Sequence, residues 1–124
     1  MTEKPRLQPG PDHPITVTPT GERVVVTVAG KVVADTNNAL SLHESTYPAV
    51  QYVPLADVDR TLLERTGTQT YCPYKGDAGY YSITVDGDTV VDAIWEYTAP
   101  YDAVAQIKDH VAFYPDRVES ITIG

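Results

Sequence analysis

The chain has 124 residues, of which 42% are hydrophobic and 21% are charged, and its formal net charge at pH 7 is −8. This length and composition predict one soluble globular domain with a single hydrophobic core. The acidic balance argues against nucleic-acid partners, because the chain has only nine Lys and Arg residues and they are spread along it. No apolar run is long enough to span a membrane.

Residues 1–13 are predicted to be a flexible tail ahead of a single domain over residues 14–124. The tail is rich in proline and polar residues and has no apolar stretch typical of a signal peptide. Cys72 is the only cysteine, so the chain forms no internal disulfide. A protein of this kind fits the cytoplasm. We expect it to be a monomer or a weak homodimer.

β-forming side chains dominate the first part of the domain. Residues 23–36 contain two Val-rich runs around Gly30 and Lys31, which predicts a hairpin with a type II′ turn. Residues 40–44 alternate apolar and polar side chains, as in a half-buried strand.

The next segment is ambiguous. Residues 55–65 fit either a short helix or a turn followed by a strand, and we favour the turn and the strand. Pro48 and Pro54 predict that any strand between them is a short edge strand, because proline has no N–H for a sheet.

The clearest signal is a hairpin over residues 79–97. Asp86 and Gly87 form a dipeptide typical of a type I′ turn, between two runs rich in aromatic and β-branched residues. A two-residue turn predicts the register, with these opposite pairs: Val85 and Asp88, Ile83 and Val90, Tyr81 and Asp92, Gly79 and Ile94.

Because strand residues alternate between faces, the hairpin has an aliphatic face and an aromatic face. The aliphatic face carries Tyr81, Ile83, Val85, Val90 and Ile94. The aromatic face carries Tyr80, Trp95 and Tyr97 beside the small residues Gly76, Ala78 and Ala93. Aromatic walls next to small residues favour a hollow of the kind that holds small molecules, although aromatic strand residues are also common in cores.

A short helix is predicted over residues 100–111, where Ala103, Ile107 and Val111 recur at a spacing of four. Two closing strands follow it. Many short strands with one or two short helices predict a mainly β, compact antiparallel domain.

The segment TYCPYKG, residues 70–76, leads directly into the hairpin. A nucleophilic Cys72 would need a neighbouring cation or histidine, and Lys75 is the only such residue nearby in the sequence. Two interpretations stay open, a reactive thiol and a residue that packs a tight corner, and we favour the second. Lys75 is the best candidate for holding an anionic group.

Glu44 ends the alternating strand on the same face as Leu40 and Leu42, so it is predicted to be partly buried. A buried carboxylate requires a partner, and Lys75, Arg60 or a tyrosine hydroxyl could supply it. The chain has no C-x-x-C or H-x-x-x-H pair, so we expect no metal and no cofactor.

The runs VADT, LHESTYPAVQYVPLADV, TYCPYKGDAGYYS and AIWEYTAPYDAVAQIKDHVAFY together resemble the bacterial and fungal family catalogued as domain of unknown function 427, which also carries a nucleotidyltransferase-like label. The resemblance covers Pro14 to Tyr114. It implies a β-tent-like fold, with two antiparallel sheets around a pocket. The signature positions implied by the family pattern are Glu44, Tyr52, Pro54, Asp57, Thr70, Cys72, Pro73, Lys75, Gly76, Trp95, Tyr97, Pro100 and Phe113.

The resemblance implies no activity. This chain has no magnesium-binding motif that would support the nucleotidyltransferase label. It also lacks the C-x-x-C pairs that hold zinc in related folds. We therefore adopt neither the label nor a structural zinc.

We therefore expect a small protein that binds a small polar or aromatic molecule in an aromatic-walled pocket. The alternatives are an enzyme of unknown reaction in the same pocket, by nucleotidyl transfer or by chemistry of Cys72 or Glu44, and a protein-interaction domain without a ligand. The predicted ligand-binding residues are Glu44, Tyr52, Thr70, Cys72, Lys75, Tyr80, Trp95 and Tyr97.

Overall fold

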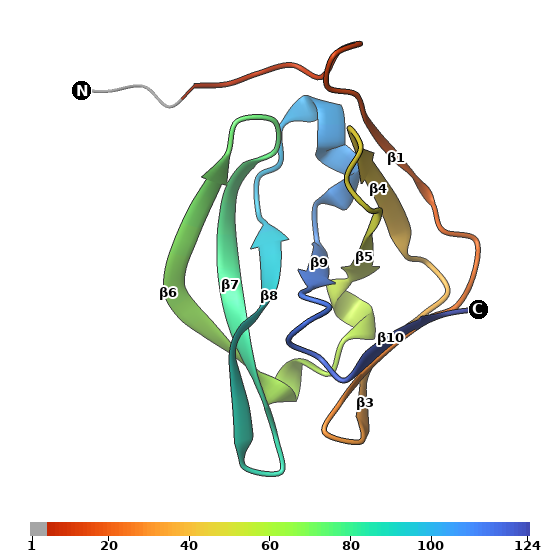
Figure 1. The fold of residues 1–124 in the computed structure, drawn as a ribbon. Coiled ribbons are helices and arrows are strands. Elements are labelled where there is room, and N and C mark those ends of the chain that lie inside the picture. The colour runs from red at the N-terminus through yellow and green to blue at the C-terminus, as the bar shows by residue number, and fades with distance from the viewer. Residues whose placement is uncertain (1–4) are drawn as a thin grey trace.

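The structure is a computed structural model that describes residues 5–124, and within that range it contains two antiparallel sheets and three short 3-10 helices (Figure 1). The order across the seven-stranded sheet is β1 (Ile15–Pro19), β4 (Leu40–Glu44), β5 (Val50–Pro54), β9 (His110–Phe113), β8 (Asp88–Tyr97), β7 (Gly76–Val85) and β6 (Leu63–Cys72). The order across the three-stranded sheet is β10 (Ser120–Ile123), β2 (Val24–Val28) and β3 (Lys31–Thr36). The helices are η1 (Leu55–Asp57), η2 (Arg60–Leu62) and η3 (Asp102–Ile107).

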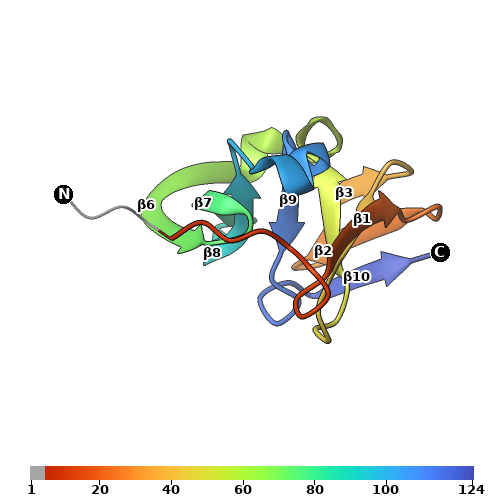
Figure 2. The same ribbon diagram turned by 90° about the horizontal axis from the view of Figure 1, so that it is seen from above.

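The expectation of a mainly β, antiparallel fold with two sheets is confirmed. Seen from above, β6, β7 and β8 curl together on one side, and the three-stranded sheet and β1 lie on the other, with β9 between them (Figure 2). None of the helices formed by residues 5–124 is long and apolar enough to cross a membrane.

The first hairpin forms as expected, but its turn lies one residue earlier. Val28 pairs with Lys31, so the turn residues are Ala29 and Gly30 rather than Gly30 and Lys31. Both have positive φ, 50° and 78°, which fits a type I′ turn and not a type II′ turn. A type I′ turn matches the twist of the flanking strands, and this outweighs the strain of a positive φ at alanine.

Residues 48–65, which include the ambiguous segment, contain β5, then the single-turn helices η1 and η2, and then the start of β6 at Leu63. The expectation that a strand here would be an edge strand is wrong, because β5 lies between β4 and β9. Pro54 is tolerated because it occupies the last position of β5. Val58, with φ −107° and ψ 141°, is extended and separates η1 from η2, so no continuous helix forms before β6.

The helix predicted over residues 100–111 is reduced to the six residues of η3. Val104 has a non-helical φ of −129°, and Val111 belongs to β9. The buried residues of η3 are Val104 and Ile107, three apart, which is the period of a 3-10 helix. Ala103 is exposed, so the predicted apolar face does not exist.

The central hairpin has the predicted turn, with φ of 51° at Asp86 and 86° at Gly87. The two pairs next to the turn are those expected, Val85 with Asp88 and Ile83 with Val90. Farther from the turn the register shifts by two residues. The pairs there are Tyr81 with Ile94 and Gly79 with Glu96, which corrects the predicted pairing with Asp92 and Ile94.

A bulge at Asp92 causes this shift. Asp92 has φ of 52°, and its N–H donates to the Ser82 hydroxyl at 3.1 Å. The hydroxyls of Thr66 and Thr68 each donate to its carboxylate at 2.7 Å. Because the shift is two residues, the assignment of side chains to faces survives, with one exception: Ala93 is fully buried in the aliphatic core.

The seven-stranded sheet therefore has two different faces. One packs against the three-stranded sheet through aliphatic side chains such as Ile83, Ile94 and Val111, all fully buried. The other faces η3, and Tyr52, Tyr80, Tyr97 and Tyr114 pack on it. Its core is formed by Leu42, Tyr52, Ala78, Tyr80, Tyr97, Val104, Ile107 and Ala112.

A buried carboxylate, Glu96, closes one end of the aliphatic face. It is 5% exposed and accepts hydrogen bonds from Arg65 at 3.2 Å and from the Tyr81 hydroxyl at 3.0 Å. A Cβ on Gly79 would lie 2.1 Å from Nη2 of Arg65. Glycine at this position therefore leaves room for the guanidinium that pairs with Glu96.

Candidate functional site

The segment of residues 70–76 forms the turn between β6 and β7. The Lys75 N–H donates to the Cys72 carbonyl at 3.2 Å. Gly76 has φ of 113°, and a Cβ there would lie 3.3 Å from the carbonyl oxygen of Ala99. Glycine thus permits both the backbone conformation and the close approach of the chain after β8. The turn places the Lys75 side chain against the end of β4.

At the end of β4, Glu44 bridges two cationic or potentially cationic side chains. Lys75, only 9% exposed, donates from its ammonium to Oε1, and His13 Nε2 lies 2.7 Å from Oε2. Burial alone would raise the pKa of Glu44, but the hydrogen bonds from Lys75 and His13 outweigh it and hold that pKa below its ordinary value. Of the partners that the sequence left open for Glu44, namely Lys75, Arg60 and a tyrosine hydroxyl, the structure has Lys75. We call these three residues the Glu44 cluster.

His13 reaches this cluster from the segment that precedes β1. Its ring stacks on Tyr74 with centroids 4.1 Å apart and planes 10° apart. Nearby, the Leu7 N–H donates to the Pro73 carbonyl at 2.9 Å. The described part of the N-terminal segment therefore contacts the turn between β6 and β7. Flexibility of residues 1–13 stays a prediction, and the first four lie outside the described part.

The aromatic face carries a set of hydrogen-bonded ring side chains. The Tyr80 hydroxyl lies 2.9 Å from Thr70 Oγ1 and 3.3 Å from the Tyr114 hydroxyl. The Trp95 indole N–H donates to the Tyr52 hydroxyl at 3.2 Å, and its ring contacts Tyr114 with centroids 4.5 Å apart. Burial raises the pKa of Tyr52 and of Tyr114, the latter to about 12, so both hydroxyls are neutral at physiological pH.

Tyr97 and Cys72 lie between this face and the Glu44 cluster. Tyr97 is 7% exposed, its ring centroid is 5.9 Å from the Lys75 ammonium, and burial raises its pKa. Cys72 is half-buried and packs against the same aromatic core. No hydrogen bond or ion pair to its thiol occurs within residues 5–124. These contacts favour Cys72 as a packing residue, and its reactivity stays a prediction.

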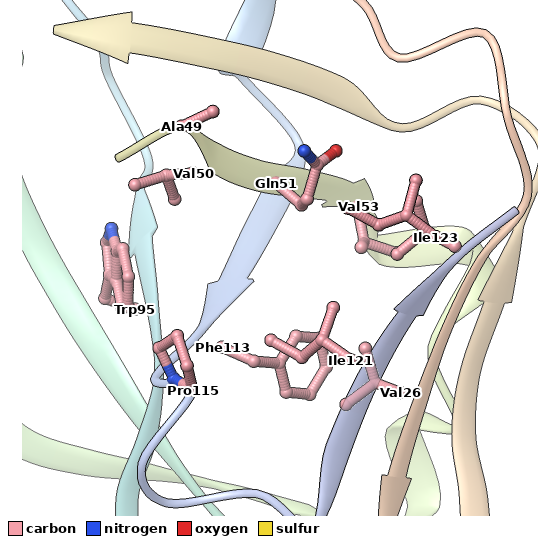
Figure 3. A pocket seen from close by; sticks show the side chains of 11 residues that line it. Val26, Ala49, Val50, Gln51, Val53, Trp95, Phe113, Pro115, Ile121 and Ile123 are labelled. Carbon is pink, nitrogen blue, oxygen red and sulfur yellow. The ribbon is translucent and has the colours of Figure 1, made fainter. Parts of the chain in front are cut away.

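A groove of about 290 Å³ lies between the two sheets (Figure 3). Its lining is almost entirely apolar. One wall comes from the inner faces of β2 and β10, and the opposite wall comes from β5, from Phe113 at the end of β9 and from Trp95 of β8. The lining residues are Val24, Val26, Ala49, Val50, Gln51, Val53, Trp95, Phe113, Pro115, Ile121 and Ile123.

The short β9 explains why Trp95 and Phe113, which point to opposite faces of the sheet, line one groove. β9 pairs with β5 only through Val111 and His110, and with β8 only through Phe113 and Ala112. Beyond Phe113 the Tyr114 N–H still donates to the Ala93 carbonyl at 2.9 Å, but no strand of residues 5–124 bridges β5 and β8, so the sheet is open there. In Figure 3 the Trp95 ring stands beside this opening, opposite β10.

Gln51 is the only lining residue with a polar side chain besides the indole of Trp95. Its amide is occupied, because its Oε1 accepts from the Thr20 hydroxyl at 2.6 Å and its Nε2 donates to Ser41 at 3.0 Å. The amide end points away from the groove, which Figure 3 shows. The groove therefore presents hydrocarbon and aromatic surface, and no free side-chain hydrogen-bonding group of the described residues that line it.

Of the eight predicted ligand-binding residues, Trp95 alone lines the groove. The other seven gather around the Glu44 cluster and the aromatic face: Glu44, Tyr52, Thr70, Cys72, Lys75, Tyr80 and Tyr97. Their role in binding stays a prediction. Among residues 5–124, no three His, Cys, Asp or Glu side chains are grouped so that they could hold a metal ion.

Sequence reasoning missed two parts of this region. His13 lies in the predicted tail, far from Glu44 in the sequence, and nothing local links the two. The walls from β2 and β10 read as ordinary core strands, because Val24, Val26 and Ile121 have the pattern of any half-buried strand. The sequence contains no signal that singles them out, and Ile123 is distinctive only in the structure, where it is 47% exposed.

One comparison with known proteins gives a result over most of the chain. The family model described as Domain of unknown function (DUF427), with the label NTP_transf_9, matches residues 16–124. No curated protein matches the chain.

Proposed function

The chain belongs to the family described as a domain of unknown function (DUF427), and from this premise, which supplies no activity, we propose that the protein is a binding module. It takes an aromatic or branched apolar group of its ligand into the groove between its two sheets. The observation that carries this proposal is the groove of about 290 Å³ with an apolar lining that includes Trp95.

The size and the lining of the groove support a small ligand group. Ligand pockets typically have volumes of roughly 300–1,000 Å³ and are mainly apolar, so this groove matches the lower end of that range. One aromatic ring or branched alkyl group would fill it. Burial of such a group typically contributes about 1.5–3 kcal/mol from its apolar surface alone. Contact with the Trp95 ring adds a preference for flat groups.

The chemistry of the lining narrows the expected ligand. A polar group placed in the groove would lose its hydrogen bonds to water and find no side-chain partner there, because the Gln51 amide is already bonded to Thr20 and Ser41. Discrimination against polar groups follows from this cost. Any polar part of the ligand must therefore lie outside the groove.

Trp95 is the only tryptophan, so its fluorescence reports on the groove without interference. Nitrobenzene, a neutral aromatic quencher, is expected to quench Trp95 saturably in the native protein and to raise its melting temperature. Ala49→Phe, at an exposed lining position, should remove the saturable component by filling the groove. Ala105→Phe, at an exposed position of η3, is the matched control and should bind like the wild type. Linear quenching in all three proteins, with no thermal shift, would contradict the proposal.

A further inference from the structure

β10 is an edge strand, and its free edge borders the groove. It pairs with β2 alone, with Ile121 opposite Val26 and Ile123 opposite Val24. In the same ladder the Gly124 N–H donates to the Arg23 carbonyl at 2.8 Å. Hydrogen-bonded and non-hydrogen-bonded pairs alternate in an antiparallel ladder, so Ile121 and Ile123 occupy non-hydrogen-bonded positions. Their N–H and C=O groups therefore point away from β2, along the free edge.

The same two residues also line the groove with their side chains. No backbone hydrogen bond outside the β10–β2 ladder uses Ile121 or Ile123 within residues 5–124. Each therefore offers a free backbone donor and acceptor at the edge and an apolar wall inside. In Figure 3, β10 runs along one side of the groove and Trp95 stands on the other. A strand added to β10 would cover the groove between them.

We propose that the ligand is an extended peptide that pairs antiparallel with the free edge of β10 and places alternate apolar side chains in the groove. This inference rests on the proposed function, because it names what carries the apolar group. Peptide residues opposite Ile121 and Ile123 have their side chains on the groove side. Strand addition of this kind takes affinity from main-chain hydrogen bonds and selectivity from alternate side-chain pockets.

Charge at the two ends of β10 specifies the flanking residues of this peptide. The exposed Asp116 precedes β10, as does Glu119, whose Oε1 accepts from the Gly30 N–H at 2.6 Å. At the other end, the Glu22 carboxylate lies 3.7 Å from the position a Cβ of Gly124 would take. Arg23 is neutralised by its two hydrogen bonds to Asp35. Carboxylates at both ends favour a peptide with Lys or Arg on both sides of its apolar residues.

A second copy of the chain is a poorer partner for the same edge. Two further cations lie near the start of β10: Lys31, which follows Gly30 in the turn bonded to Glu119, and Arg117. The Arg117 guanidinium is over the Tyr114 ring and donates to the Asp92 carbonyl. Antiparallel pairing of two β10 strands would bring the acidic ends of both together. The net charge of −8 on each chain adds to this repulsion.

The test uses the acetylated, amidated peptide Lys-Phe-Thr-Phe-Lys, followed by Trp95 fluorescence and calorimetry. With one Phe opposite Ile121 and the other opposite Ile123, both Phe N–H groups face β10 and the Thr N–H faces away. N-methylation of both Phe residues keeps the side chains and removes two main-chain donors. It is expected to weaken binding at least about tenfold, whereas N-methylation of Thr should change it less than about twofold.

The outcomes separate this inference from the proposed function. If nitrobenzene binds saturably but the doubly methylated and unmethylated peptides bind alike, or neither binds, pairing with β10 is refuted and the groove remains a binding site. If nitrobenzene does not bind either, the proposed function is refuted as well. Concentration-dependent dimerisation in sedimentation experiments, abolished by Ile123→Pro, would assign the edge to a second copy and overturn the peptide.

A protein variant tests the same hydrogen bonds from the other side. Ile123→Pro removes a free-edge N–H that the β10–β2 ladder does not use, and Ile123→Ala shortens the same side chain but keeps the N–H. Both should weaken nitrobenzene binding to a similar extent. Peptide binding should fall at least about fivefold further in Ile123→Pro than in Ile123→Ala, and equal peptide affinities would contradict the proposal.

Discussion

The two faces of the seven-stranded sheet are built by the same strands but by different chemistry. On the face toward the three-stranded sheet, Ile83 and Ile94 are fully buried among aliphatic side chains. On the face toward η3, Tyr52 and Tyr80 are buried but keep their hydroxyls in hydrogen bonds. One face stabilises the fold by excluding water, and the other holds polar groups in fixed positions at the cost of less favourable burial.

The difference teaches where function can lie in a small β domain. An aliphatic face can recognise a ligand only through its apolar surface and shape, and its substitution costs stability first. An aromatic face with satisfied hydroxyls tolerates loss of single groups, because each net hydrogen bond contributes only about 0.5–1.5 kcal/mol. The groove lies where the two faces meet, at the opening of the sheet beside Trp95.

The largest effect is expected on the aliphatic face. Ile94→Ala should lower the free energy of unfolding by about 3–4 kcal/mol, because Ile94 is fully buried and its truncation leaves a cavity. Urea unfolding followed by far-UV circular dichroism measures this. Val91→Ala, on the same strand but 65% exposed, is the control and should stay within about 0.5 kcal/mol. A loss below about 1 kcal/mol for Ile94→Ala would remove the distinction between the faces.

A smaller and pH-dependent effect is expected at the Glu44 cluster. Glu44→Gln should destabilise the protein by about 2 kcal/mol at pH 7, since it leaves the nearly buried Lys75 without its carboxylate. The pKa of Glu44 is lowered by folding, so its stabilising contribution is present above the unfolded pKa and is lost as the pH falls through the folded value.

The difference between wild type and Glu44→Gln should therefore shrink as the pH is lowered below about 4. Urea unfolding at several pH values checks this. Glu64→Gln, at an exposed position of β6, is the matched control and should show no such trend. A difference that stayed constant with pH would show that Glu44 acts through packing and not through its charge.

On the aromatic face itself, Tyr80→Phe should cost about 1 kcal/mol. The ring stays buried, and only the hydroxyl contacts with Thr70 and Tyr114 are lost. A double-mutant cycle with Thr70→Val isolates the bond between the two hydroxyls. Tyr74→Phe removes a hydroxyl that bonds to no described residue and should be nearly neutral. A cost above about 3 kcal/mol would mean that this face is as intolerant as the aliphatic one.

The smallest effect is expected at Cys72. Cys72→Ala should cost about 0.5–1 kcal/mol, because the thiol is half-buried and packs against the aromatic core without a hydrogen bond or ion pair among the described residues. Binding of nitrobenzene to the groove should be unchanged. Loss of that binding in Cys72→Ala would show that the thiol belongs to the binding site and would support a direct role for it there.

Features that depend on local chemistry could be predicted from the sequence. The turn at Asp86 and Gly87 was predictable because both residues tolerate positive φ, and the pairs next to it followed. The register beyond was not, since it depends on Ser82 capturing the N–H of Asp92 across the hairpin. The predicted assignment of side chains to the two faces of the hairpin remained correct, except at Ala93, because the bulge shifts the register by two residues and not by one.

The candidate site was harder to predict than the fold. That Glu44 needs a partner could be expected, because the alternation of β4 turns the carboxylate inward, but the sequence did not separate Lys75 from Arg60 or a tyrosine hydroxyl. The groove could not, because its walls come from five strands in two sheets, and its opening depends on where β9 stops. The contribution of His13 depends on the path of the chain before β1, for which no periodic signal exists.

The brevity of β9 also has a mechanical consequence. Two residue pairs and the hydrogen bond from the Leu55 N–H to the Asp109 carbonyl connect it to β5. Two pairs and the hydrogen bond from the Tyr114 N–H to the Ala93 carbonyl connect it to β8, so the seven-stranded sheet consists of two halves joined along a short seam. Separation of the two halves of the sheet would break few hydrogen bonds. A ligand bound beside Trp95 would contact both halves at once. Amide hydrogen exchange of Val111 and Ala112 should therefore slow on binding, although neither residue lines the groove.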